Sequence, residues 1–149
     1  MQNPLTFDGF IQICIVVADI EKTAQKWAEL FNLPMPEIMV DPPRKNPDLT
    51  YRGQETWYGI KMAIISAGPF VIELIEPDEN ESTFREFLDK HGNGVHHLGF
   101  AVGDKRDNVI SELESLGFDM RTIGFWPGGS WTVVDSEDAL GVNLNIKPE

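Results

Sequence analysis

Cysteine and basic residues are both scarce in this chain of 149 residues. Cys14 is the single cysteine, so no internal disulfide can form, and we expect the reducing cytoplasm as its compartment. Lys and Arg number 12 against 24 Asp and Glu, and the net charge of −12 argues against nucleic acid or an anionic membrane surface as a partner. No apolar run reaches the roughly 18 residues of a membrane span, and we see no secretion signal at the start. The length suits a single domain, which we expect to occupy residues 1–149.

Hydrophobic patterning divides the chain into two similar halves. The first half is predicted to hold a strand, a helix and two more strands, at residues 10–17, 19–31, 59–66 and 70–76, with a further strand near 34–40. A short helix at 83–91 follows, for which Thr83 and Glu86 have the spacing of a capping box. The polar, proline-broken residues 41–54 are expected to be a surface loop or a lid. The second half repeats the order, with elements expected at 95–102, 104–116, 121–125, 131–134 and 142–146.

An internal repeat is the simplest explanation of this order. Placing Gln12 over His97, an offset of 97 − 12 = 85, aligns the two halves and also brings Asp19 over Asp104. Each half is then one βαβββ unit, at about residues 8–77 and 93–149, joined by the helix at 83–91. We therefore expect an α+β fold, in which two βαβββ modules pair into a cupped mixed β-sheet. The concave side of such a sheet is the default ligand cavity.

Four polar side chains stand in the predicted strands among apolar neighbours, namely Gln12, Glu73, His97 and Asn145. A buried carboxylate such as Glu73 is tolerated only when it is paired or functional. Gln12 and His97 occupy corresponding positions in the two halves, and so do Glu73 and Asn145. We therefore expect all four side chains to converge in the cavity. By strand alternation His96 should point to the opposite face from His97. Cys14 lies in an apolar strand and is expected to be a buried structural thiol.

Three segments carry a resemblance to a known family: residues 10–22 (FIQICIVVADIEK), 72–77 (IELIEP) and 94–102 (GVHHLGFAV). With these segments the chain resembles the vicinal oxygen chelate superfamily, which includes glyoxalase I, extradiol dioxygenases and bleomycin-resistance proteins. Within it, the segments are most similar to the methylmalonyl-CoA epimerase-like branch. The resemblance covers nearly the whole chain, and it implies the fold of paired modules and a homodimer.

In metal-dependent members of this superfamily four side chains bind one divalent ion. The resemblance places these ligands at Gln12, Glu73, His97 and Asn145. Gln12 stands where His is usual, and Asn145 stands where Glu is usual. Amide oxygens suit hard ions such as Mg²⁺ or Mn²⁺ and are poor ligands for zinc or nickel. We therefore expect either no cofactor or a weakly bound divalent metal (Mn, Mg, Ni, Co or Zn).

The residues and the resemblance together predict an isomerase- or lyase-type enzyme that transfers a proton next to a carbonyl. Glu73 in an apolar cavity should have a raised pKa and serve as the general base. His97 would act as its acid partner or as an electrophile, while Gln12 and Asn145 would stabilise an oxyanion. The small, largely apolar substrate is expected to contact Trp57, Tyr58, Met62, Phe125, Trp126 and Trp131.

Other interpretations stay open at this point. The chain is alternatively a metal-dependent epimerase- or glyoxalase-like enzyme, or a non-catalytic protein that sequesters an aromatic compound. The four polar groups would also satisfy one another as the remnant of a metal site, and the aromatic residues would equally suit a dimer interface. Racemisation of methylmalonyl-CoA is disfavoured, because the resemblance places Asn145 and Met62 at its two acid–base positions. Neither an amide nor a thioether takes a proton from carbon.

Overall fold

The computed structural model describes residues 4–43 and 49–149 of the chain. Its strands are β1 (Phe10–Val16), β2 (Met39–Asp41), β3 (Thr50–Tyr51), β4 (Gln54–Glu55), β5 (Ile60–Ala67), β6 (Phe70–Pro77), β7 (Gly94–Ala101), β8 (Met120–Trp126), β9 (Gly129–Val134) and β10 (Asn143–Lys147). Its helices are α1 (Ile20–Phe31), α2 (Thr83–His91), α3 (Arg106–Ser115) and α4 (Glu137–Leu140). The longer elements lie close to the bounds that the sequence predicts, because the hydrophobic periods and capping residues that define them are local. The strand predicted near 34–40 is the shorter and later β2, and β3, β4 and α4 were not predicted.

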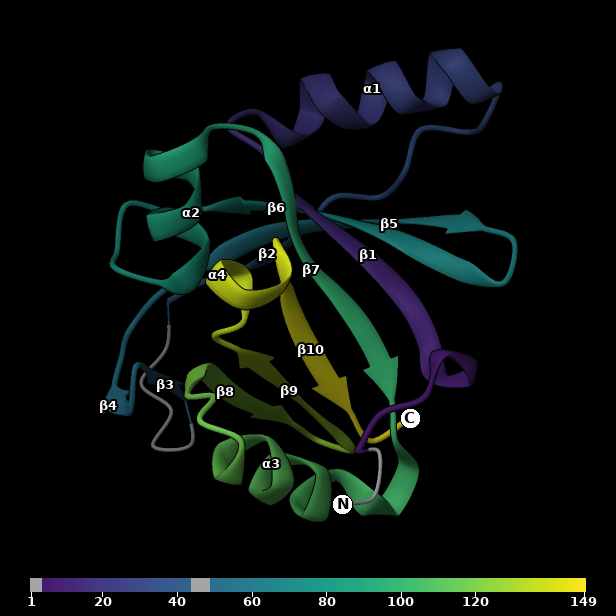
Figure 1. Cartoon of the computed structure of the whole chain (residues 1–149). Coiled ribbons are helices and arrows are strands. Elements are labelled where there is room, and N and C mark those ends of the chain that lie inside the picture. Colours follow the sequence, from purple (N-terminus) through teal and green to yellow (C-terminus); the bar gives the residue numbers. More distant parts are fainter. Residues whose placement is uncertain (1–3, 44–48) are drawn as a thin grey trace.

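In the described part of the chain the strands form one continuous ten-stranded sheet, in the order β2-β5-β6-β1-β7-β10-β9-β8-β3-β4. β1 is parallel to β6 and β7 is parallel to β10, while β1 and β7 run antiparallel at the centre of the sheet. The sets β1-α1-β2-β5-β6 and β7-α3-β8-β9-β10 therefore have the same connectivity (Figure 1). The predicted fold, two βαβββ modules paired into one curved mixed sheet, is confirmed.

The two long helices cover the outer face of the sheet. In the first module Ile20 and Ala24 of α1 pack with Leu74 of β6, and Trp27 is partly buried against this cluster, as its helical spacing predicts. In the second module Val109 of α3 packs with Ile146 of β10 in the equivalent way. Because strand residues alternate between faces, Glu73 and Asn145 are left on the inner face. None of the helices in the described residues has the length and apolarity that a bilayer crossing requires.

Side-chain caps fix where the first two helices begin. Asp19 accepts a hydrogen bond from the backbone N–H of Lys22 at 3.1 Å and so caps α1. For α2 the capping box predicted at Thr83 is one residue late. Ser82 is the N-cap and accepts from the N–H of Arg85 at 3.0 Å, which leaves Thr83 as a buried first helical residue.

The segment predicted as a loop or lid at 41–54 contains two short strands. We call residues 49–58 the strap; residues 44–48, which belong to the same predicted loop, lie outside the described residues. β3 of the strap pairs antiparallel with β8 of the second module, although the strap follows β2 of the first. Arg52 secures it by ion pairs of 2.6 Å to Glu86 of α2 and 3.3 Å to Asp135 after β9. The strap thus extends the free edge of the second module, with β3 beside β8 and β4 beside β3.

Candidate functional site

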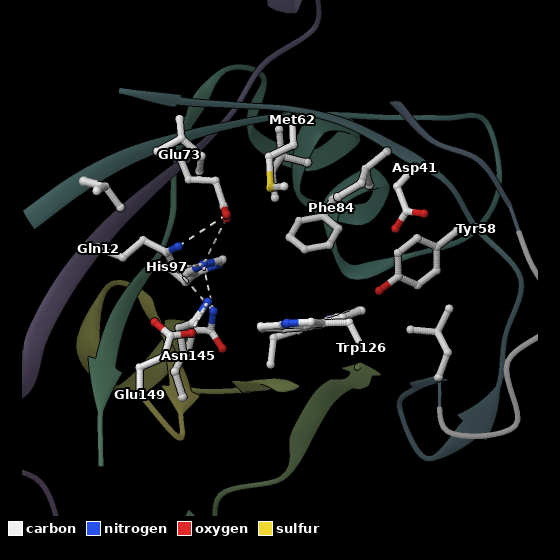
Figure 2. Close-up of a pocket in the computed structure, with 17 residues that line it drawn as sticks. Gln12, Asp41, Tyr58, Met62, Glu73, Phe84, His97, Trp126, Asn145 and Glu149 are labelled. Atoms are coloured by element: carbon white, nitrogen blue, oxygen red, sulfur yellow. Dashed lines mark hydrogen bonds and ion pairs between the residues drawn. The ribbon is translucent and has the colours of Figure 1, made fainter. Parts of the chain in front are cut away.

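The inner face of the sheet holds a cavity of about 560 Å³. Its apolar lining comes from both modules, the strap and α2: Leu49, Ile60, Met62, Ile64, Val71, Ile75, Phe84, Trp126 and Trp131. Its polar and charged lining is Gln12, Asp41, Tyr58, Glu73, His97, Asn145, Lys147 and Glu149. Figure 2 shows Glu73, Gln12, His97 and Asn145 gathered at one end, with Asp41 and Tyr58 at the other. The cavity is therefore an apolar chamber with its hydrogen-bonding groups concentrated at its ends.

The structure brings all four of the predicted polar residues together. Gln12 Nε2 donates to Glu73 Oε2 at 3.3 Å, and His97 Nε2 lies 3.0 Å from Gln12 Oε1. Asn145 Nδ2 donates to the same Gln12 oxygen at 3.4 Å. The four side chains come from the adjacent strands β6, β1, β7 and β10, which are the central strands of the two modules. All four are buried.

Gly99 makes this convergence sterically feasible. It lies on β7 directly between Gln12 of β1 and Asn145 of β10 in the strand register. A Cβ at this position would stand 2.8 Å from Cβ of Gln12 and 2.9 Å from its Oε1. A larger residue would therefore push Gln12 away from His97 and Glu73.

Within the described residues, Glu73 is a buried carboxylate without a charged partner at hydrogen-bond distance. Burial raises its pKa above the ordinary value of 4.5, against opposing effects from the charge of Lys147 and a hydrogen bond with Cys14. The nearest imidazole nitrogen, Nε2 of His97, is 3.8 Å from Oε1, and burial followed by the proximity of His96 lowers the pKa of His97 well below its usual range. The pair is thus a carboxyl group with a raised pKa beside a neutral imidazole.

Cys14 lies closer to the site than its sequence context suggested. It is fully buried, as expected, but it stands two residues after Gln12 and so shares the cavity-facing side of β1. Burial and the neighbouring Glu73 raise the pKa of its thiol well above the ordinary value, which keeps it protonated as a donor to the carboxylate. The i, i+2 spacing from Gln12 was the signal that could have placed it.

His96 does not point away from His97, contrary to the strand-alternation prediction. Cys14 pairs with His97 in the register, but Ile15 pairs with Val95, so His96 is an extra residue in a β-bulge. The bulge turns both rings to the same side, and their Nδ1 atoms are 2.8 Å apart. Nε2 of His96 in turn lies 3.0 Å from Oγ1 of Thr83, at the start of α2. Burial lowers the pKa of His96 to about 3, so both rings are neutral.

The hydrogen bonds determine which nitrogen carries each proton. The Glu73 carboxylate accepts from Nε2 of Gln12, so the acceptor oxygen of Gln12 faces His97. Two contacts compete for Nε2 of His97: the Gln12 oxygen at 3.0 Å calls for a proton there, whereas Nδ2 of Asn145 at 3.3 Å would donate to a bare nitrogen. The Gln12 contact is the shorter, and Nδ2 of Asn145 has the same Gln12 oxygen as another acceptor, so we place the proton on Nε2. Nδ1 of His97 is then bare and accepts from Nδ1–H of His96. Nε2 of His96 accepts in turn from the Thr83 hydroxyl. A directed chain of hydrogen bonds thus runs from α2 to the base of the cavity.

Asn145 does not present an oxygen to the centre of the cluster. Its Oδ1 accepts from the backbone N–H of Thr132 at 3.1 Å, so its NH₂ group faces Gln12 and His97. With Nε2 of His97 also a donor, the four residues do not form the four-ligand metal set that the family resemblance implied. Ligand atoms of Cys14, Glu73 and His97 do lie within 4.8 Å of one another. To coordinate an ion, the Cys14 thiol and Nε2 of His97 would each have to give up the proton that it donates in a hydrogen bond.

The six predicted substrate-binding residues divide into two groups. Tyr58, Met62, Trp126 and Trp131 line the cavity, and the indoles of the last two stack at 5.6 Å with an interplanar angle of 18°. Trp57 and Phe125 do not line it, and their residues are 50% and 38% exposed. Phe125 precedes the lining residue Trp126 on β8, so strand alternation turns it outward, whereas Trp57 lies in the irregular segment between β4 and β5.

Sequence reasoning missed several lining residues that matter chemically, among them Phe84, Lys147 and Glu149. Phe84 of α2 packs against both histidine rings, at centroid distances of 4.9 Å to His96 and 6.5 Å to His97. Lys147 lies two residues after Asn145 on β10 and so shares its face. That spacing could have revealed Lys147, whereas only the folded chain could bring α2 over the cavity.

A curved mixed sheet of two βαβββ modules, with a polar cluster at one end of its cavity, defines a class of small-molecule-binding proteins built on paired modules. The family described as the glyoxalase/bleomycin resistance protein/dioxygenase superfamily matches residues 11–133. The chain therefore belongs to this superfamily, and the resemblance seen in its sequence is confirmed.

A curated relative and several solved structures are similar to this chain. It is 30% identical to the uncharacterized protein YqjC of Bacillus subtilis (strain 168), over 44% of this chain and 54% of the relative, so the match spans about half of that protein's length. A hypothetical protein from Bacillus halodurans C-125 has a TM-score of 0.63 at 22% identity, covering 93% of this chain and 91% of the other. Methylmalonyl-CoA epimerase from Mycobacterium tuberculosis has a TM-score of 0.62 at 22% identity, covering 99% and 91%. A Streptomyces coelicolor epimerase variant in complex with 2-nitronate-propionyl-CoA has a TM-score of 0.62 at 20% identity, covering 93% and 92%. These structures share the fold of the chain.

Proposed function

We propose that this protein is an enzyme that transfers a proton at the carbon next to a carbonyl of a small, largely apolar substrate, with Glu73 as the base. The observation that carries the proposal is the buried Glu73 carboxyl group in the cavity wall, whose pKa burial raises. A base with a raised pKa takes a proton more effectively near neutral pH than an ordinary carboxylate does. Gln12 and Cys14 hold the group in place by hydrogen bonds.

His97 supplies a hydrogen-bond donor beside this base. Its ring is neutral, so it acts as an electrophile that polarises the substrate carbonyl rather than as a cationic acid. The NH₂ group of Asn145 points to the same place. A substrate oxygen that replaced the Gln12 oxygen as acceptor would accept hydrogen bonds from both His97 and Asn145. These hydrogen bonds would become stronger as negative charge develops on the enolate oxygen.

The number and position of the carboxylates that line the cavity favour a reaction on one face of the substrate. Among the described residues that line the cavity, Glu73 is the buried carboxylate, whereas Glu149 is exposed and Asp41 lies at the far end. Met62 also lines the cavity and cannot accept a proton. One carboxyl group that removes and returns the proton accomplishes an isomerisation or an elimination, whereas racemisation requires an acid–base group on each face. The epimerases with the same fold are therefore poor guides to the reaction of this chain.

The stacked Trp126 and Trp131 indoles and the apolar lining favour a flat ring system bearing a ketone. The test is solvent exchange: 2-tetralone and 1-indanone are incubated in D₂O with the protein, and loss of the α-proton signal is followed by NMR. We expect catalysed exchange, and a loss of about 10²-fold or more in Glu73→Gln. Glu76→Gln, on the other face of the same strand, is the matched control and should exchange at the wild-type rate.

The same assay separates the two other interpretations. If EDTA abolishes exchange and Mn²⁺ or Mg²⁺ restores it, the enzyme depends on a metal. If the ketones quench tryptophan fluorescence stoichiometrically but no α-proton exchanges, the protein binds an aromatic compound without catalysis. Exchange that persists in Glu73→Gln would contradict the assignment of the base.

A further inference from the structure

Lys147 is the single cationic side chain among the described residues that line the cavity. Lys147 follows Asn145 by two positions on β10, so its side chain leaves the strand on the cavity side. The side chain is only 12% exposed. Its charge opposes the rise that burial causes in the pKa of Glu73 and adds to the lowering of the pKa of His97, in line with its place on the same face of β10 as Asn145.

The amine of Lys147 is held by two partners that also line the cavity. Its Nζ is 3.3 Å from Oε1 of Glu149 and 5.2 Å from the centroid of the Trp126 ring. Figure 2 shows Glu149 beside Asn145 at the polar end. The carboxylate of Glu149 therefore already lies beside the Lys147 ammonium group, which also contacts the Trp126 ring. The Glu149 side chain is half exposed, so leaving this position costs it little desolvation.

We propose that Lys147 forms a subsite for a carboxylate of the substrate, and that Glu149 occupies this subsite until the substrate displaces it. The substrate class is then an apolar, aromatic monocarboxylate, with its ring on Trp126. The inference deepens the proposed function by naming the class of the ketone substrate, but the binding step does not depend on Glu73 being the base. Polyanions do not fit, because Asp41, Glu73 and Glu149 also line the cavity.

Binding of a carboxylate probe and its uncharged analogue tests the proposal without any turnover. Wild-type protein is titrated with 3-phenylpropanoate and with 3-phenylpropanamide at neutral pH, by calorimetry and by tryptophan fluorescence. The carboxylate should bind about tenfold more tightly than the amide. Lys147→Met keeps the length of the aliphatic stem against Trp126 and should abolish this difference. Glu149→Gln removes the competing charge and should tighten binding of the carboxylate severalfold, with no change for the amide.

Lys61→Met is the matched control. Lys61 lies on β5 of the same sheet and is also paired with a glutamate, Glu76 at 3.5 Å, but it does not line the cavity. Its removal changes the net charge by the same amount and should leave both affinities at wild-type values. Equal affinity of the two probes for the wild type, full discrimination in Lys147→Met, or unchanged carboxylate affinity in Glu149→Gln would each overturn the proposal. If Lys147→Met does not fold, the affinities of the two probes for Lys147→Gln and for the wild type still test the proposal.

Discussion

Replacing Gly124 by alanine should displace the ring of Trp131, which forms part of the aromatic wall of the cavity. Gly124 of β8 lies opposite Trp131 of β9 in the strand register, with the indole ring packed directly over it. An added Cβ would overlap Cζ2, Cε2 and Cη2 of that ring. The ring has little freedom to move away, because it stacks on Trp126 and packs against the buried core of the inner face.

The magnitude follows from two opposing effects. Forcing extra volume into a packed site typically costs about 1–3 kcal/mol, while replacing glycine by alanine inside a strand recovers roughly 0.5–1 kcal/mol. Because the added Cβ would overlap three ring atoms, we take the upper part of the cost range, about 2–3 kcal/mol, and expect Gly124→Ala to lose about 1–2.5 kcal/mol of unfolding free energy. At about 2–4 °C per kcal/mol for a chain of this size, the melting temperature should fall by about 2–10 °C.

Gly94→Ala is the control, because a Cβ there would make an ordinary contact of 3.5 Å with Phe87. It should be as stable as the wild type or slightly more stable. Urea unfolding gives the free energies, and near-ultraviolet circular dichroism reports the coupling of the stacked Trp126 and Trp131. If Gly124→Ala matched Gly94→Ala in stability and kept the wild-type dichroism, the packing argument for this wall would be wrong.

Three further predictions concern the polar cluster. Because burial raises the pKa of Glu73, the folded state binds that proton more tightly than the unfolded state; stability should therefore fall as pH rises from 4.5 through the raised pKa, and Glu73→Gln should remove this part of the pH dependence of urea unfolding. The double variant Gln12→His/Asn145→Glu, which installs the side chains usual in metal-dependent relatives, should bind Mn²⁺ or Ni²⁺ near stoichiometrically in calorimetry while the wild type does not; equal binding by the two proteins would contradict the orientation of Asn145. In ¹⁵N-histidine NMR of the wild type, Nε2 of His97 and Nδ1 of His96 should carry the protons, and a proton on Nδ1 of His97 would reverse the inferred chain of hydrogen bonds.

Local signals in the sequence determined the elements and their repetition. The helix from Ile20 is visible in the apolar spacing of Ala24 and Trp27 and in the capping Asp19, all within one or two turns. Glu73 was identifiable because a carboxylate between two apolar strand residues conflicts with burial unless it has a purpose. The offset that pairs Gln12 with His97 then predicted that the polar residues converge, since equivalent positions of two repeats face the same cavity.

Only the tertiary structure decided what the cluster can do. The bulge that turns His96 toward His97 arises from the register between β7 and β1. The alternation of residues along β7 alone gives no sign of this register. The orientation of Asn145 depends on the backbone N–H of Thr132 on the neighbouring strand, and this contact decides whether the residue offers an oxygen or a hydrogen. The strap pairs with the second module across a long separation in sequence, since its partner strand β8 follows it by about seventy residues. Periodicity fixes which face a residue occupies, whereas the partner groups across the sheet fix its proton, its charge and its chemistry.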